Sequence, residues 1–421
     1  MRVSTETTYE RVVITGIGAI TSLGCSMSET WQALLEGHSG VDQITQFDSK
    51  LTKVSIAGEV KNFNANNYLE SKEIRRLDRV SLFALAAAKQ AVWDSKLPDY
   101  PPEEVGTIFA TGIGGIISNH RTHAQYLAEG DWRIPPYMIP MILPNISASL
   151  VAIHFGFQGP CICPVSACAA SAEAVGMGYR MIRRSEIRAC LVGGCEACIT
   201  PAVVAGFYNM GVLSKYTGDP KKACKPFDRD RDGFVIAEGS VALVLERLSD
   251  VIADGRPYYA EISGFGQTCD AYHLAAPHPL GKGAARAMKL ALMESSFTPD
   301  QVAYINAHGT ATAASDSVET LSIKEALGEY AYKTIVTSTK SMTGHMLGAT
   351  GALEIAICAL AIKTGKIPPT INYSYQDPTC DLNYSPNIAS EALVDVAISN
   401  SMGFGGHNIA LLCNNTEAKG S

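Results

Sequence analysis

Residues 164–171 read Pro-Val-Ser-Ala-Cys-Ala-Ala-Ser, a run of small residues that leads from an apolar segment into a predicted helix. Beyond this run, apolar side chains recur at intervals near 3.6 residues, as on one face of an α-helix: Ala172, Val175, Tyr179 and Ile182. The pattern places Cys168 at a helix N-terminus, where free backbone N–H groups and the helix dipole favour thiolate over thiol. We therefore expect a reactive cysteine here, although a free cysteine is usually a small buried packing residue and this chain has 12.

Two histidines in the second half of the chain occur in matching contexts. His308 lies in Asn-Ala-His-Gly-Thr-Ala-Thr after the short apolar stretch 302–305, and His345 lies in Lys-Ser-Met-Thr-Gly-His-Met after residues 334–337. Both imidazoles follow a predicted strand and stand among small residues, where a loop can present them to a cleft. Residues 400–408, Asn-Ser-Met-Gly-Phe-Gly-Gly-His-Asn, add a glycine-rich turn whose N–H groups can approach an oxyanion.

These motifs, taken in order, resemble those of the elongating β-ketoacyl-acyl carrier protein synthases of type II fatty acid synthesis, and most closely the synthase II subgroup. The resemblance covers nearly the whole chain. It also includes Val-Val-Ile-Thr-Gly at 12–16, Gly-Gly-Cys-Glu at 193–196 and Pro-Phe-Asp-Arg-Asp-Arg-Asp-Gly-Phe at 226–234. It implies the thiolase fold, an α/β architecture in which two similar halves form a five-layered α-β-α-β-α sandwich, and it implies a homodimer.

The chain itself indicates two halves. A valine- and isoleucine-rich strand at 11–20 ends in Gly-Ile-Gly, and residues 258–266 repeat that design. Helical patterns at 81–95 and 283–295 follow in comparable places, and the polar segment 248–256 is a plausible link. We therefore predict an N-terminal half at 1–255 that carries the cysteine and a C-terminal half at 256–421 that carries both histidines.

Composition excludes several classes of protein. A chain of 421 residues with 47% hydrophobic content can bury a large core, and a formal net charge of −7 gives no general attraction to nucleic acid. The N-terminus has no apolar signal region, and the hydrophobic stretch 189–212 is interrupted by Glu196 and Pro201, so it is not expected to span a membrane. Many cysteines without a signal peptide favour a cytoplasmic location.

The resemblance implies a decarboxylative Claisen condensation. The thiolate of Cys168 would take an acyl chain from a thioester, and a malonyl group on acyl carrier protein would then lose carbon dioxide and attack the acyl-enzyme. His308 and His345, as neutral imidazoles, would stabilise the charge that develops on the malonyl thioester oxygen. The backbone N–H groups of Cys168 and Phe404 would form the oxyanion hole, and Phe404 matches the family's gating aromatic residue.

Further residues follow from the same resemblance. Lys340 is expected to be catalytic and folded against His345, and because a buried lysine needs a carboxylate partner, we predict that Glu354 supplies it. Ile113 matches the floor of the acyl pocket. Supporting positions are Asp316, Thr310 and Thr312. No metal or dissociable cofactor is expected, since the substrate carries its phosphopantetheine on the carrier protein.

Carrier proteins are acidic, so docking on a net negative chain requires a local basic patch. Lys72, Arg75 and Arg76 form one candidate patch. Lys221, Lys222 and Lys225 form another.

Two apparent metal motifs are not expected to bind metal. Residues 228–233 resemble the start of an EF-hand loop, but position twelve would be Gly239 instead of a bidentate glutamate, and the interleaved arginines predict an ion-paired structural loop. The cysteines at 161–198 lack the paired spacing of zinc sites.

Departures from the family pattern leave alternatives open. Ala313 and Ser315 stand where most elongating synthases have Pro and Gly, and Met402 replaces the first aromatic residue of the C-terminal motif. A second reading is therefore the catalytic ketosynthase subunit of a type II polyketide or polyene pathway, paired with a cysteine-less chain-length subunit. A non-catalytic subunit is disfavoured because Cys168, His308 and His345 are intact. A thiolase is disfavoured because residues 403–408 offer no second catalytic cysteine.

Overall fold

The computed structural model describes residues 9–418 and 420, and it contains ten strands that join into one hydrogen-bonded sheet in the order β10-β9-β13-β14-β8-β1-β7-β6-β4-β5. Their bounds are β1 Val12–Ile20, β4 Val105–Ala110, β5 Cys161–Ile162, β6 Ala189–Glu196, β7 Gly239–Arg247, β8 Glu261–Cys269, β9 Tyr304–Asn306, β10 Ile335–Thr337, β13 Val396–Gly403 and β14 His407–Asn414. Two small two-stranded sheets lie outside this sheet, β2 Asp42–Gln43 with β3 Ile56–Ala57 and β11 Lys366–Ile367 with β12 Ser390–Glu391.

The large sheet consists of two five-stranded halves with the same internal plan. In the N-terminal half, β7 pairs antiparallel with both β1 and β6, and β6, β4 and β5 run parallel. In the C-terminal half, β14 pairs antiparallel with both β8 and β13, and β13, β9 and β10 run parallel. The two half-sheets are joined through β1 and β8, where Val12 and Val13 pair with Ile262 and Glu261. This repeated plan confirms the two similar α/β halves expected from the sequence.

Thirteen helices accompany the strands in the described part of the chain. They are α1 Met27–Leu35, α2 Ser71–Ile74, α3 Arg79–Ser95, α4 Ile116–Glu129, α5 Met138–Ile142, α6 Ile146–Phe155, α7 Ala170–Arg183, α8 Pro201–Asn209, α9 Leu248–Ala253, α10 Lys282–Ser295, α11 Ser315–Leu327, α12 Lys340–Thr343 and α13 Thr350–Thr364.

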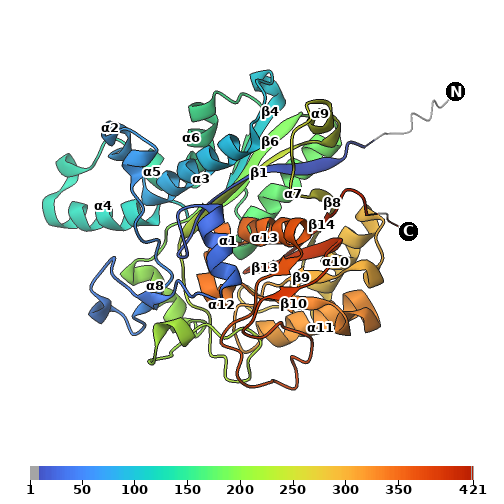
Figure 1. Cartoon of the computed structure of the whole chain (residues 1–421). Helices are drawn as coiled ribbons and strands as arrows, with labels where there is room; N and C mark the ends of the chain where they lie inside the picture. Colours follow the sequence, from blue (N-terminus) through green and yellow to red (C-terminus); the bar gives the residue numbers. More distant parts are fainter. Residues whose placement is uncertain (1–8, 419, 421) are drawn as a thin grey trace.

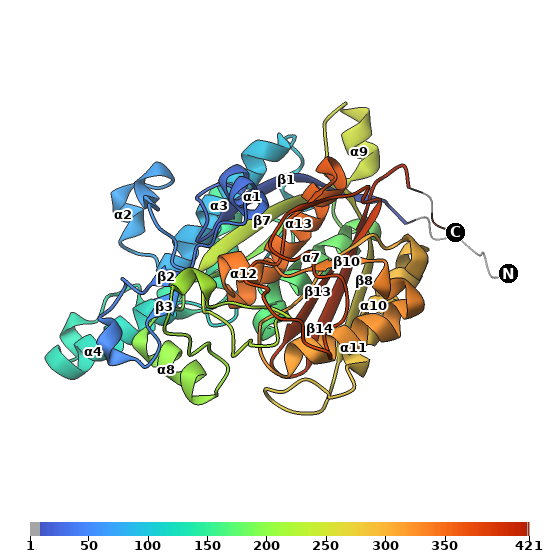
Figure 2. The same ribbon diagram turned by 60° about the horizontal axis from the view of Figure 1, so that its bottom comes forward.

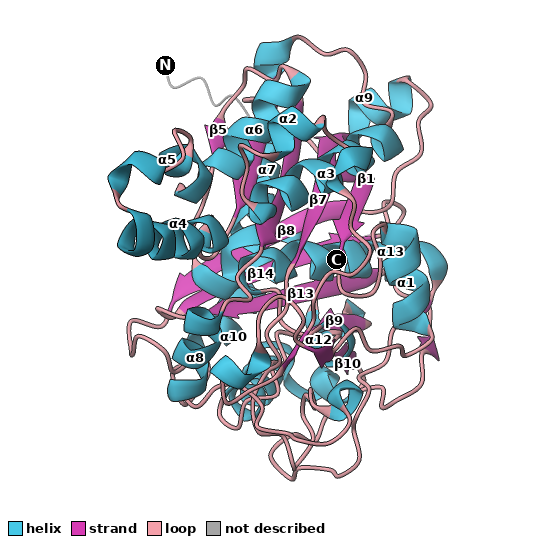
Figure 3. Ribbon diagram, turned by 90° about the vertical axis from the view of Figure 1, so that its left-hand side faces the viewer, coloured by secondary structure: helices cyan, strands magenta, loops and turns pink. Residues whose placement is uncertain are grey.

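The helices complete five layers (Figures 1 and 2). α3 and α6 cover the outer face of the N-terminal half-sheet, and α10, with α11 beside it, covers the outer face of the C-terminal one. α7 and α13 pack against each other between the two half-sheets, and each contacts strands of both halves. Figure 3 shows the strands of the halves running through the molecule with helices on either side. The thiolase-type sandwich is thereby confirmed.

Apolar burial follows these layers, with one core cluster between the half-sheets and one on each outer face. The segment from Leu347 to Thr364 has the length and apolar composition of a membrane span, yet 78% of it is buried inside the fold. It contains α13, the central core helix, so its apolar character is explained by packing.

The polar link at 248–256 contains the short helix α9, one side of which is buried through Leu248 and Val251. The stretch 189–212 was expected to be buried strand and loop, and this expectation needs correction, because Thr200 caps the helix α8 that follows β6. The division at residue 255 stays a prediction.

Candidate active site

The site residues lie where parallel strands of both halves end. Gly112 and Ile113 follow β4, Glu196 ends β6, and His308 follows β9. Lys340 and His345 follow β10, and Phe404 follows β13. The carboxyl ends of parallel strands in α/β sheets commonly form a crevice. For this reason, segments more than 200 residues apart in sequence lie side by side at the site.

Cys168 lies in a short 3-10 turn, Ala167–Ala169, immediately before α7, as the apolar periodicity predicts. Ala167 has φ +51°, in the left-handed region that alanine rarely adopts. Gly403 packs against this turn so closely that a Cβ at position 403 would lie 2.5 Å from the Ser166 carbonyl oxygen. The strained turn thus fixes the sulfur against the end of β13.

One cavity of about 470 Å³ joins the predicted catalytic groups. Cys168, His308, His345 and Phe404 all line it, together with the predicted pocket residue Ile113 and the supporting residues Thr310 and Thr312. Much of the remaining wall is apolar and includes Phe207, Phe234, Leu347 and Met402. An apolar cavity with a thiol and two imidazoles suits an acyl thioester.

The two imidazoles face each other almost perpendicularly, with ring centroids 5.5 Å apart. His345 Nδ1 lies 3.1 Å from the Thr350 hydroxyl, and its ring meets the edge of Phe234. Burial, and then the positive charge of Lys340, hold the pKa of both histidines well below the usual value. Both rings are therefore neutral at physiological pH, and a neutral ring can donate one N–H to an oxygen in the cavity.

The predicted Lys340–Glu354 pair is confirmed. Both side chains are almost completely buried, and the Lys340 ammonium is paired with the Glu354 carboxylate. Glu354 also accepts a 3.4 Å hydrogen bond from the Ser401 hydroxyl. Burial raises the pKa of the Glu354 carboxyl to about 7, against the opposing effect of Lys340.

The expectation that Cys168 rests as a thiolate is wrong for this cavity. Burial raises the pKa of the Cys168 thiol to about 12, although Lys340 and the N–H groups of Phe404 and Cys168 lower it. The loss of hydration of a buried anion outweighs the helix terminus here. The resting cysteine is a thiol, and it needs a base as it attacks.

This pKa has a measurable consequence. The rate at which iodoacetamide alkylates Cys168 is expected to rise about tenfold per pH unit between about pH 7 and pH 9, because the thiolate fraction rises in that proportion. Intact-mass kinetics in a Cys161→Ser, Cys269→Ser background, which removes the two exposed thiols of the described residues, measure it. A rate that levels off near pH 7 would instead show a depressed pKa.

Two buried glutamates were missed by the sequence reasoning. Glu319 on α11 accepts 2.7 Å hydrogen bonds from the backbone N–H groups of His308 and Gly309 and from the Asn400 amide. Glu196 accepts from the N–H groups of Gly112, Ile113 and Gly348.

These carboxylates hold the loops that carry the histidines and the pocket floor. Burial raises the pKa of Glu196 to about 7 and also raises that of Glu319. For Glu319 a signal existed, because Asp316 and Glu319 are spaced three apart on one helix face. Glu196 stood out in the sequence only as part of the motif at 193–196, with no role assigned to it.

Asp316 lies at the start of α11, where its carboxylate accepts a 2.7 Å hydrogen bond from Phe227 N–H. It is buried, and burial raises its pKa to about 7. Asp316 is not among the described residues that line the cavity, and its hydrogen bond instead holds the loop of Phe227 against α11. Lys72, Arg75 and Arg76 are exposed on and just after α2, outside the cavity.

Comparisons with known proteins agree with this geometry. The chain matches the family "Beta-ketoacyl synthase, N-terminal domain" over residues 9–251 and "Beta-ketoacyl synthase, C-terminal domain" over residues 259–374. A relative from Synechocystis sp. named 3-oxoacyl-[acyl-carrier-protein] synthase 2 is 46% identical over 404 residues, which cover 96% of this chain and 97% of the relative.

Two solved structures also resemble the whole chain. A type II polyketide synthase ketosynthase in complex with its acyl carrier protein has a TM-score of 0.91 and 30% identity, covering 97% of this chain and 100% of that one. The ishigamide ketosynthase/chain length factor has a TM-score of 0.90 and 34% identity, covering 97% of this chain and 99% of that one. By its sequence, its sandwich fold and its cysteine–histidine cavity, this chain belongs to the beta-ketoacyl synthase family.

Proposed function

We propose that the protein is a 3-oxoacyl-[acyl-carrier-protein] synthase that extends an acyl chain by two carbons through decarboxylative condensation with malonyl-acyl carrier protein. The observation that carries this proposal is the single cavity shared by the Cys168 thiol and two neutral imidazoles. Near full-length similarity to a relative of that name supports it.

In the first stage, the Cys168 sulfur attacks the carbonyl carbon of an acyl thioester. The thiol proton passes to a neutral imidazole as the C–S bond forms, and it then leaves with the thiol of the carrier's phosphopantetheine. The N–H groups of Cys168 and Phe404, both directed at the sulfur region, stabilise the tetrahedral oxyanion. The product is an acyl-enzyme on Cys168 and a free carrier thiol.

In the second stage, a malonyl thioester loses carbon dioxide, and the electron pair of the broken C–C bond moves into an enolate. N–H groups of His308 and His345 stabilise the enolate oxygen, whose charge develops in the transition state. The enolate carbon attacks the acyl-Cys168 carbonyl, the C–S bond breaks, and the sulfur leaves as a thiolate that takes a proton from solvent, because its first proton left with the carrier thiol. Burial and the charge of Lys340 keep both rings neutral, so that one of them can accept the Cys168 thiol proton in the first stage.

Chain length and access are part of the same proposal. Ile113 at the cavity wall limits the acyl chain, and Phe404, whose ring lies 6.4 Å from that of Phe207, moves aside to admit it. The only prosthetic group in the scheme is the phosphopantetheine of the carrier, and a cytoplasmic location agrees with twelve free cysteines.

Carrier docking is proposed at Lys72, Arg75 and Arg76, three exposed cations around α2. Replacing Arg75 and Arg76 together by alanine is expected to raise KM for the acyl-carrier substrate about fivefold at an ionic strength near 0.01 M. The effect should shrink to less than about twofold near 1 M, because salt screens exposed charges. Steady-state kinetics at both salt concentrations measure it.

The control for this test is the replacement of Lys221 and Lys222, two exposed cations of the second basic cluster, by alanine. It should leave KM unchanged if α2 is the docking surface. If the control variant rather than the α2 variant shows salt-dependent weakening, docking occurs on the second cluster.

A second copy or a sister chain is proposed to pair at the sheet edge formed by β5. This strand ends the ten-strand order, and Cys161 on it is exposed. Ile153 on α6 and Val165 after β5 expose 78% and 54% of their surface, and an unpaired edge beside exposed apolar side chains favours association.

The second candidate function is a polyketide ketosynthase paired with a chain-length subunit, favoured by the similarity to the ishigamide ketosynthase/chain length factor. Light scattering on the protein purified alone distinguishes the two candidates. A stable active homodimer supports the fatty acid synthase, and activity only with a co-expressed partner supports the polyketide enzyme.

The direct test of the proposed reaction is intact-mass analysis after incubation with acyl-carrier thioesters from C2 to C16, followed by malonyl-carrier. We expect an acyl adduct on Cys168 that disappears when malonyl-carrier is added, with release of 3-oxoacyl-carrier. Turnover of acetyl-CoA alone, without malonyl-carrier, would instead indicate a thiolase.

A further inference from the structure

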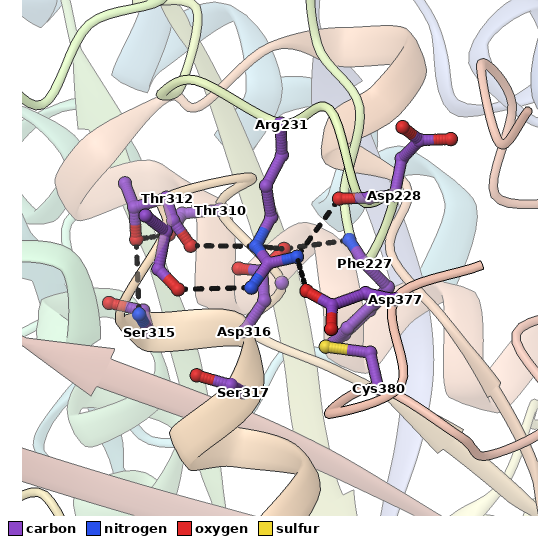
Figure 4. A network of polar contacts seen from close by, with 12 residues as sticks. Phe227, Asp228, Arg231, Thr310, Thr312, Ser315, Asp316, Ser317, Asp377 and Cys380 are labelled. Carbon is purple, nitrogen blue, oxygen red and sulfur yellow. Dashed lines mark hydrogen bonds and ion pairs between the residues drawn. The ribbon is translucent and has the colours of Figure 1, made fainter. Parts of the chain in front are cut away.

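Arg231 is a buried cation for which the reaction scheme has no use. Its side chain is 5% exposed, and it belongs to the loop of alternating aspartates and arginines at 228–233. The guanidinium lies between Thr310 and Thr312 on one side and Asp228 and Asp377 on the other (Figure 4). An arginine with so little exposure requires a full set of partners.

Two of those partners are carbonyl oxygens of the segment 310–315, which we call the mouth segment. Arg231 Nε donates to the Thr312 carbonyl at 3.1 Å, and Nη2 donates to the Ala313 carbonyl at 3.0 Å. A third bond joins the same two loops, from Gly233 N–H to the Ala311 carbonyl at 2.9 Å. Three consecutive carbonyls of the mouth segment are therefore held by residues 231–233.

The guanidinium is itself held from the other side. Nη1 donates to the Asp228 carbonyl at 2.9 Å and to the Asp377 carboxylate at 2.6 Å. Nε also lies 3.9 Å from the carboxylate of Asp316, the residue that begins the acidic first turn of α11. Arg231 thus ties the mouth segment to two loops that do not line the cavity.

The mouth segment needs such a support. It lines the cavity through Thr310, Thr312 and Ala313, and Ala311 has φ +64°, a conformation that alanine seldom adopts. Ala313 stands where most elongating synthases have proline, so this chain lacks the ring that would restrict the backbone there. The hydrogen bonds from residues 231–233 can supply that restriction.

We propose that Arg231 is a positioning residue that fixes the shape of the mouth segment for the carrier-bound thioester. This inference rests on the proposed function. Arginine is required because its planar fork reaches two adjacent carbonyls at once while it stays paired with carboxylates. Lysine would keep the positive charge but could not donate to both carbonyls from one planar group.

The test is Arg231→Lys. We expect KM for malonyl-carrier to rise about tenfold while kcat changes less than about twofold, because the catalytic groups stay in place and only the approach of the substrate is disturbed. Hydrogen exchange of the amides at 310–316 should become faster, with the other core segments unchanged. Alkylation of Cys168 by iodoacetamide, which needs no docked carrier, should keep its rate.

Rescue by Ala313→Pro separates positioning from a general structural role. In the Arg231→Lys background this change should restore KM to within about threefold, because proline restricts the same backbone. Within the described residues the Ala313 N–H donates no hydrogen bond, so proline removes none. In the native background Ala313→Pro should change little, since the segment is already fixed.

Arg229→Met is the matched control. Arg229 is two residues away, its side chain is 56% exposed, and it pairs with Asp230 instead of the mouth segment. It should leave KM and exchange unchanged. Asp377→Asn weakens the ion pair that holds Arg231 and leaves the arginine in place. It should also raise KM, by a smaller factor than Arg231→Lys does. This variant replaces Arg231→Lys in the test if Arg231→Lys does not fold.

An unchanged KM with unchanged exchange in folded Arg231→Lys, or a loss that Ala313→Pro does not restore, would overturn the proposal. If the native protein itself fails to load Cys168 or to condense, the proposed function fails instead. The two failures are therefore distinguishable.

Discussion

Cys168→Ala is expected to lower the rate of condensation by a factor of about 10³ or more. The acyl chain then has no covalent attachment, and the single difficult transfer is no longer divided into two easier ones. Decarboxylation of malonyl-carrier should persist within about tenfold of the native rate, because His308 and His345 remain in the cavity without the sulfur. Carbon dioxide release and 3-oxoacyl-carrier formation, measured side by side, check both expectations.

His345→Ala is the complementary control for this prediction. It should lower decarboxylation while an acyl group still loads on Cys168, because acyl transfer uses the N–H groups of Cys168 and Phe404 for its oxyanion and His308 remains to accept the thiol proton. If Cys168→Ala condenses at the native rate, the nucleophile has been misassigned. If it loses decarboxylation completely, the two stages do not use separate groups.

Lys340→Met is expected to destabilise the protein by about 3–5 kcal/mol at pH 8.5, because it leaves the Glu354 carboxylate buried without its partner. The loss should be smaller at pH 6. Burial raises the pKa of the Glu354 carboxyl to about 7 even when Lys340 is present. Without Lys340, this carboxyl is therefore protonated in the folded protein at pH 6. At pH 8.5 it ionises readily in the unfolded chain, whereas ionisation in the folded protein costs free energy. Stability supplied by the neutral form is lost as pH rises through the folded pKa.

Urea unfolding of the variant at the two pH values, against the native protein, measures this difference. The double variant with Glu354→Gln is the matched control, because glutamine has the same shape and no charge, so its stability should vary less with pH. Equal losses at both pH values in Lys340→Met would show that packing of the long side chain, and not the uncompensated carboxylate, stabilises this region.

The catalytic machinery could be predicted from local sequence where a short motif fixes a local structure. The period of apolar residues after Cys168 gave the helix α7, and the short apolar stretches before His308 and His345 gave β9 and β10. The Lys340–Glu354 pair came from the family resemblance, and the need of a buried lysine for a carboxylate was its physical reason. The helix and the two strands follow from neighbours within a few turns of the chain.

Other properties depend on contacts between distant segments. Helix position alone predicted a thiolate at Cys168, but the walls contributed by Phe207, Phe234 and Met402 remove water from the sulfur and raise its pKa. In the same way, Glu196 and Glu319 gained their roles only when backbone N–H groups from other loops converged on them.

The sequence by itself determined the groups that the proposed reaction would use, that is, the Cys168 thiol and two imidazoles, and the alternation of strands and helices that brings them to the same edge of a sheet. Tertiary structure alone decided their protonation states and the support of the mouth segment by Arg231. The physical reason is that the protonation state of a group depends on its hydration and on the electric field of nearby charges. Both are set by residues that are far apart in the sequence.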